Sequence, residues 1–119
     1  MVGRVTHLLK QKLGGEAMLE LAILTDDGIK VPDVGWCSES FLAQHWSDVV
    51  LRKAPEISVE VVSRSNSEVE LRSKTALYLN MGAIEVWLVA EDEVVEIHTQ
   101  NEPREDSTFG FNPAAELSA

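Results

Sequence analysis

The sequence predicts an α/β domain in which helices flank a central mixed β-sheet, with elements in the order αβββαββ. Residues 57–62 (ISVEVV) form a short β-branched run that is typical of a buried strand. Residues 67–81 carry apolar side chains at helical spacing, and Gly82 follows where a helix would end. Because an apolar run at residues 84–89 comes next, the helix is predicted to be a crossover between two neighbouring strands.

The remaining elements follow from local patterns. A helix is predicted at residues 5–13 and a strand at residues 17–24, followed by a turn at Asp26, Asp27 and Gly28. The next strand contains Asp33, and residues 38–51 are predicted to be irregular or a short helix. After the second helix come the strand at residues 84–89, an acidic turn at residues 91–93 and a last strand that ends at Thr99.

A chain of 119 residues has room for one domain and buries roughly 65% of its unfolded surface. We assign residues 1–100 to a single domain. Residues 101–119 are polar, carry Pro103, Gly110 and Pro113, and show no period. They are predicted to be an irregular or disordered tail.

The composition excludes several classes of protein. There is no apolar run long enough to cross a membrane and no signal-like segment, so no membrane partner is expected. The single cysteine, Cys37, excludes an intramolecular disulfide framework and lacks the spacing of a metal ligand. We interpret Cys37 as a packing residue and predict a cytoplasmic protein.

Three charged residues stand in apolar surroundings. Asp33 alternates with Ile29 and Val31 in a predicted strand, Glu60 lies in mid-strand, and Lys74 falls on the apolar stripe of the second helix. A charge is costly there unless it serves another charge, a metal ion or a substrate. These three residues are therefore the candidate functional site.

Each residue also has an ordinary interpretation. Asp33 follows Pro32 as a turn residue would, and Glu60 would be unremarkable on a solvated strand face. Lys74 is one helical turn from Glu70, an exposed pairing worth about 0.3–0.5 kcal/mol. If all three ordinary interpretations hold, the chain is an unrelated α/β binding module with solvated acids.

The order of these residues resembles a known family. PDV, followed by PEISVEVVSRSNSEVELRSKTALYLNMGAIEVWLV, is similar to the Uma-type restriction endonuclease family, a small branch of the PD-(D/E)XK nuclease superfamily. The resemblance extends from about residue 5 to residue 99. Its most specific part comprises Glu60 to Ser63, Ser65-Asn66, Lys74, Tyr78, Gly82 and Glu85 to Trp87.

The resemblance implies a restriction-endonuclease-like fold and a Mg²⁺-dependent endonuclease that hydrolyses DNA phosphodiester bonds, with Mn²⁺ as a possible substitute. It implies Asp33 and Glu60 as metal ligands, and Lys74 as catalytic base or charge stabiliser. Many relatives keep the lysine two positions after the glutamate, where this chain has Val62. Lys74 must therefore reach the same point from the helix.

These residue types suit that chemistry. Two carboxylates aimed at one point hold Mg²⁺ through oxygen atoms, and the backbone carbonyl near Val62 is a candidate further ligand. The cation activates water and clamps phosphate, while an ammonium offsets the charge that grows on phosphorus. Two crowded acids without a cation raise each other's pKa. Glu20, in the first predicted strand, is a possible substitute ligand but is more typical of an edge or solvent residue.

The net charge of −10 has the wrong sign for a surface that holds a polyanion. It favours an alternative, in which a catalytically degenerate nuclease-fold protein acts as a binding or assembly module. The available phosphate contacts, each of which is more often ordinary surface charge, are Arg4, Lys10, Lys12, Arg52, Lys53, Arg64 and Arg72.

Trp46, near Phe41 and Leu42, predicts an exposed apolar patch and a possible homodimer.

Overall fold

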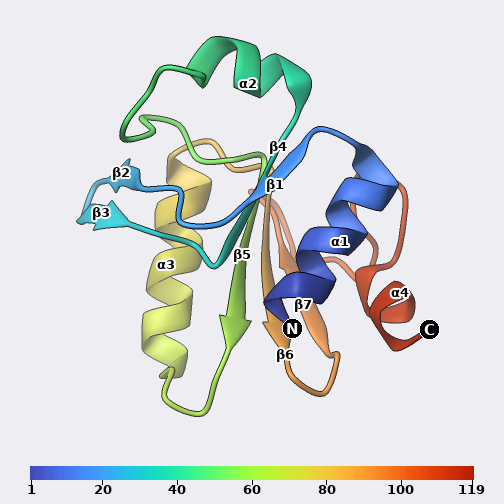
Figure 1. Ribbon diagram of the computed structural model, residues 1–119. Helices are drawn as coiled ribbons and strands as arrows, with labels where there is room; N and C mark the ends of the chain where they lie inside the picture. The colour runs from blue at the N-terminus through green and yellow to red at the C-terminus, as the bar shows by residue number, and fades with distance from the viewer.

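The computed structural model describes residues 1–119, and its centre is a five-stranded mixed sheet with helices on both faces (Figure 1). The strands lie in the order β1 (Glu16–Met18), β4 (Val34–Cys37), β5 (Ile57–Val62), β6 (Glu85–Ala90) and β7 (Val95–His98). The central β5 and β6 are parallel, and every other neighbouring pair is antiparallel. The predicted fold class, with its mixed sheet and flanking helices, is confirmed.

Helix α3 (Glu68–Asn80) connects β5 to β6, as the crossover prediction requires. Its first turn is capped by Ser67, whose side chain accepts a hydrogen bond from the backbone N–H of Glu70. Gly82 follows the helix with a φ of 98°, a conformation that residues with a Cβ rarely adopt. Local sequence signals thus fix both ends of the helix that carries Lys74.

The sheet separates two hydrophobic cores. Helices α1 (Val2–Leu13) and α4 (Pro113–Ser118) cover the face that includes Trp87. Helices α2 (Glu39–His45) and α3, with strand β2 (Ile23–Thr25), contribute to the second core, which includes Tyr78. β2 pairs with β3 (Gly28–Lys30) in a small hairpin beside α3, and its Ile23 also forms a parallel bridge with Leu51 (Figure 1). No helix combines the length and the apolar character that spanning a bilayer requires.

The single strand predicted at residues 17–24 is wrong. The chain forms β1 in the main sheet and β2 in the hairpin, with Leu19 and Glu20 exposed between them. Glu20 has a φ of 60°, which a continuous strand does not allow. The segment breaks because its two halves pair with different partners, β4 and β3, in different sheets.

The predicted strand through Asp33 is also divided. β3 ends at Lys30 and β4 begins at Val34, with Pro32 between them. Proline lacks the N–H that a continuous ladder needs, and the two strands belong to different sheets. Ile29 and Val31 are 58% and 47% exposed, so the buried face predicted for them and Asp33 does not exist.

The predicted irregular tail contains helix α4, so that prediction is wrong for residues 113–118. The Asn112 side chain accepts a hydrogen bond from the N–H of Ala115, and Pro113 occupies the first turn. Leu117 is buried in the first core, with Phe109 and Phe111 packed against it. The apolar residues of the segment 101–119 are sparse and have no helical period, so the sequence did not indicate that α4 packs on the first core.

Predictions for isolated side chains have mixed outcomes. Trp87 is fully buried and Cys37 is 1% exposed, as packing residues should be. Burial, with a smaller contribution from Glu56, raises the pKa of the Cys37 thiol to about 12. Trp46 is 81% exposed, which confirms an exposed aromatic residue there. The self-association that this exposure favours stays a prediction.

Candidate metal and catalytic site

Glu60 lies in the middle of β5 and points to the α3 side of the sheet. Ile57 and Val59 belong to the first core, so the alternating Ser58 and Glu60 face the other way, as the strand period predicts. Glu60 is 4% exposed, which excludes the solvated-face interpretation. Its Oε1 lies 3.4 Å from Lys74 Nζ, and its Oε2 has no hydrogen-bond partner.

The environment of Glu60 disfavours its ionised form. Burial is the main cause that raises the pKa of this carboxyl to about 7, from an ordinary 4.5. Lys74 opposes the shift, and the negative charges of Asp33 and Glu70 add to it. The lysine alone therefore does not compensate for burying this carboxylate, and a second cation at Oε2 would favour ionisation.

Asp33 stands at the rim of the sheet, one residue before β4. Because Val34 is opposite Val59 in the antiparallel β4–β5 pair, the same register sets Asp33 opposite Glu60. Directly opposed residues of such a pair project to the same face. The Asp33 Oδ2 accepts a hydrogen bond of 2.7 Å from the N–H of Val61 and so extends the pairing beyond the last regular pair. Asp33 itself is exposed.

Lys74 comes from α3, on the helix face that also carries the buried Leu71 and Tyr78. Its Nζ lies 3.4 Å from Glu60 Oε1 and 3.6 Å from Glu70 Oε1. Lys74 therefore makes both the inward contact with Glu60 and the ordinary ion pair with Glu70, one helical turn away. With 27% of its side chain exposed, Lys74 remains accessible to a ligand at the rim.

Two carboxylates and one ammonium form the candidate site. No third Asp, Glu, His or Cys joins Asp33 and Glu60 in a group that could hold a metal ion. Glu20 is exposed in the link between β1 and β2 and is not part of such a group. Any cation bound at this point must take its remaining ligands from backbone, water or substrate.

Tyr78, one of the residues that carry the family resemblance, is a neighbour of the candidate site that the sequence did not indicate as a site residue. Tyr78 is fully buried four residues after Lys74, yet its hydroxyl has no hydrogen-bond partner. Burial raises its pKa, and the charges of Glu60 and Asp33 raise it further. The available signal was a polar-tipped aromatic residue one helical turn after the lysine, on the same stripe.

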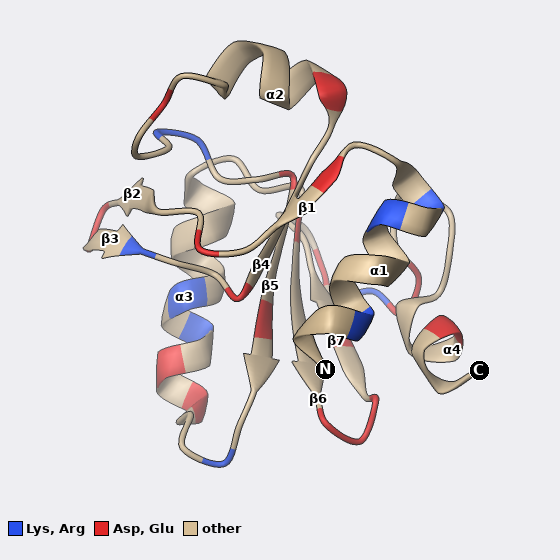
Figure 2. Ribbon diagram, in the orientation of Figure 1, with Lys and Arg blue, Asp and Glu red and all other residues tan.

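Basic residues are present on this side of the molecule, although acidic ones outnumber them over the whole chain (Figure 2). Arg72 and Lys74 lie on α3, Arg64 is in the β5–α3 loop, and Lys30 ends β3 (Figure 2). Arg72 is paired with Glu68 at 2.6 Å and Lys30 with Asp27 at 3.4 Å. Arg64 is exposed and is therefore the most available phosphate contact here.

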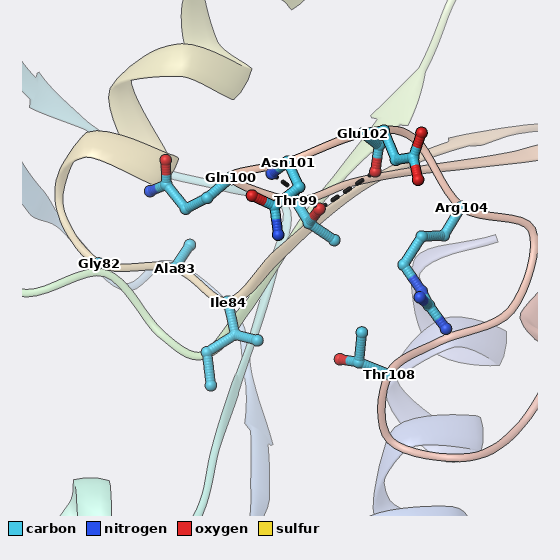
Figure 3. A pocket seen from close by; sticks show the side chains of 9 residues that line it. All are labelled: Gly82, Ala83, Ile84, Thr99, Gln100, Asn101, Glu102, Arg104 and Thr108. Atoms are coloured by element: carbon cyan, nitrogen blue, oxygen red, sulfur yellow. Dashed lines mark hydrogen bonds between the residues drawn. The ribbon is translucent and has the colours of Figure 1, made fainter.

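A hollow of about 540 Å³ lies elsewhere on the surface (Figure 3). Its lining comes from residues 82–84, which precede β6, and from the segment after β7, and includes Ile84, Gln100 and Arg104. None of the three candidate residues lines it. Unpartnered buried polar atoms indicate a missing ligand more directly than open volume does, and Glu60 carries such an atom.

The mixed five-stranded sheet with flanking helices defines an α/β protein. A family model described as "Uma2: Putative restriction endonuclease" matches residues 2–118. The chain therefore belongs to the Uma2 family, and the family resemblance inferred from its motifs is confirmed.

A crystal structure described as a putative nuclease belonging to DUF820, from Anabaena variabilis, has the same fold. The TM-score is 0.71 at 20% sequence identity, over 98% of this chain and 74% of that chain. At this identity the likeness concerns the fold alone. None of the curated proteins compared with the chain matches it.

Proposed function

We propose that this chain is a divalent-metal-dependent endonuclease that hydrolyses DNA phosphodiester bonds. Asp33 and Glu60 would hold Mg²⁺, or Mn²⁺ in its place, with Lys74 as charge stabiliser or catalytic base. The observation that carries the proposal is the buried Glu60 carboxylate, which has one free oxygen, lies next to Lys74 and is opposite Asp33 in the strand register. Family membership supports the class of reaction.

The residues fit a hard cation with oxygen ligands. Glu60 Oε2 is buried without a partner, and the hydrogen bond from Val61 occupies only Oδ2 of Asp33, which leaves Oδ1 available. A carboxyl whose pKa is raised to about 7 by burial is half protonated near neutral pH and gains from a nearby positive charge. Binding of the cation would therefore be coupled to release of a proton from Glu60.

The chain supplies specific parts of the reaction. A divalent cation held here lowers the pKa of water and offsets phosphate charge. Lys74, held by Glu60 on one side and Glu70 on the other, presents its ammonium to the negative charge that develops on the phosphoryl oxygens. A role as general base would instead require Lys74 to lose its proton first. The exposed position of Asp33 leaves the rim open to a strand of DNA.

A second candidate function is a catalytically degenerate nuclease-fold protein that acts as a binding or assembly module. The net charge of −10 favours it, because an acidic surface opposes association with DNA. The cluster provides only two acids, and position 62 is valine where many relatives keep the lysine. Under this alternative the site binds a cation without supporting hydrolysis.

The test combines a plasmid-nicking assay with Mn²⁺ binding measured by calorimetry. We expect nicking that requires Mg²⁺ or Mn²⁺, is lost with Glu60→Gln, and falls about 100-fold or more with Lys74→Met. Glu91→Gln, in the exposed β6–β7 turn, is the control and should behave as the parent protein does. Glu60→Gln should also abolish Mn²⁺ binding.

The outcomes separate the alternatives. Nicking that survives both site substitutions would come from another site or from a contaminant, and the proposed residues would be wrong. Glu60-dependent Mn²⁺ binding without any nicking would favour the degenerate binding module. A parent protein that binds no divalent cation would overturn both the metal site and the proposed mechanism.

A further inference from the structure

Two buried polar atoms near the candidate site lack partners. They are Oε2 of Glu60, on β5, and the hydroxyl of Tyr78, on α3. Glu60 is 4% exposed and Tyr78 is 0% exposed, so bulk water does not satisfy either group. A buried polar group without a hydrogen bond costs about 1–3 kcal/mol. Both groups lie between α3 and the sheet, so a single ligand bound there would be able to satisfy both.

The geometry directs the Tyr78 ring toward the site. Lys74 and Tyr78 are four residues apart on α3, and Tyr78 belongs to the same core cluster as Val86 and Leu88 of β6. Long side chains on a helix lean toward its N-terminus, a tendency that directs the Tyr78 side chain toward the turn that carries Lys74. Lys74 in turn contacts Glu60 at 3.4 Å. The raised pKa of Tyr78, to which the Glu60 and Asp33 charges contribute, is consistent with this proximity.

We propose that Tyr78 is a positioning residue of the metal site: its hydroxyl donates a hydrogen bond to a water molecule that Glu60 and the bound cation hold. This inference rests on the proposed metal site and adds a residue to it. Mg²⁺ and Mn²⁺ commonly retain water when few protein ligands are available, and this site offers two carboxylates. The hydroxyl then finds its partner only when the site is filled.

The proposal distinguishes Tyr78 from a purely structural tyrosine. A structural hydroxyl contributes to the stability of the metal-free protein, whereas an unpartnered one contributes nothing or destabilises it. The hydroxyl should instead affect the affinity for the cation, as residues that orient metal ligands usually do by 10–100-fold. Stability without metal and affinity for metal therefore separate the two roles.

The experiment compares the parent protein with Tyr78→Phe and Thr75→Val, using Mn²⁺ as the probe. Thr75 is a matched control, since it is buried on the same helix and its hydroxyl already donates to the carbonyl of Leu71. Calorimetry gives the Mn²⁺ dissociation constant, and thermal unfolding in EDTA gives stability without metal. For Tyr78→Phe we expect a Mn²⁺ dissociation constant about tenfold larger than that of the parent, and an unfolding temperature no lower than that of the parent. Thr75→Val should keep the parent dissociation constant.

Three results would overturn the inference. If Tyr78→Phe binds Mn²⁺ as tightly as the parent while Glu60→Gln does not bind, Tyr78 has no role and the metal site stands. If Tyr78→Phe loses affinity only together with unfolding temperature, its hydroxyl is structural. If the parent protein binds no Mn²⁺, the proposed metal site fails and the role of Tyr78 fails with it.

Discussion

Glu60 is a buried acidic residue, and we propose that it binds the metal ion. The carboxyl is buried next to a single ammonium, and burial raises its pKa from 4.5 to about 7. Below about pH 4.5 the carboxyl is protonated in both the folded and the unfolded chain, so it has no effect on stability through ionisation. As the pH rises to about 7, the unfolded chain loses this proton while the folded protein keeps it. The folded protein therefore becomes less stable over this interval.

Glu60→Gln removes this ionisation and should make the metal-free protein more stable at high pH. Relative to the parent, we expect its free energy of unfolding to increase by about 3 kcal/mol between pH 4.5 and pH 8, because the shift spans about 2.5 pKa units. Urea unfolding in EDTA at several pH values measures this difference. Glu91→Gln, at an exposed turn, should show no such trend. A constant difference between Glu60→Gln and the parent across this pH range would contradict the prediction.

At the scale of elements, another buried carboxylate joins the C-terminal segment to the sheet. Glu85, the first residue of β6, is fully buried and accepts hydrogen bonds from the side chains of Trp87 and Ser107. Its Oε2 accepts two more, each 2.5 Å long, from the N–H and hydroxyl of Thr108. Unlike Glu60, Glu85 has donors on both oxygens. This difference marks Glu85 as a structural residue and is consistent with the site role proposed for Glu60.

Glu85→Ala should release the segment that precedes α4. The substitution leaves buried donors of Trp87 and Ser107 without their acceptor, so we expect a loss of at least about 3 kcal/mol in unfolding free energy. Urea unfolding measures the loss, and limited proteolysis should show cleavage after residue 100. Glu96→Ala, an exposed change on β7, should stay within about 0.5 kcal/mol of the parent. An equally small effect for Glu85→Ala would show that the carboxylate does not anchor the segment.

The whole molecule carries a net charge of −10 within a Cα radius of gyration of 13.2 Å. Most of its ion pairs are exposed and each contributes little, about 0–1 kcal/mol. Repulsion among the excess acids acts over the whole surface and is screened by salt. Ionic strength should therefore change the stability of the folded protein.

Raising the salt concentration from about 10 to about 300 mM should increase the unfolding temperature by a few degrees, because screening weakens the repulsion more than it weakens the exposed pairs. Differential scanning fluorimetry in NaCl and EDTA measures this shift. Choline chloride at the same ionic strength should produce an equal shift, which excludes binding of Na⁺ at the acidic site. A lower unfolding temperature at high salt would mean that specific ion pairs dominate the electrostatic energy.

Local patterns in the sequence determined the parts of the fold that short-range physics governs. The β-branched run around Glu60 fixed a buried strand, and alternation fixed which of its side chains share a face. The apolar stripe of α3 and the glycine after it fixed the crossover helix and the inward position of Lys74. These features depend on residues no more than a few positions apart, so the sequence alone carries them.

Pairing between distant segments decided the rest. The same local signals favoured one strand through Glu20 and another through Asp33, but each run divides because its halves join different sheets. The register of β4 with β5 brings Asp33 opposite Glu60, and docking on the first core orders α4. The unpartnered atoms of Glu60 and Tyr78 also depend on which groups surround them in the folded chain. Burial and hydrogen bonding between remote residues are properties of the packed molecule, and a one-dimensional pattern does not specify them.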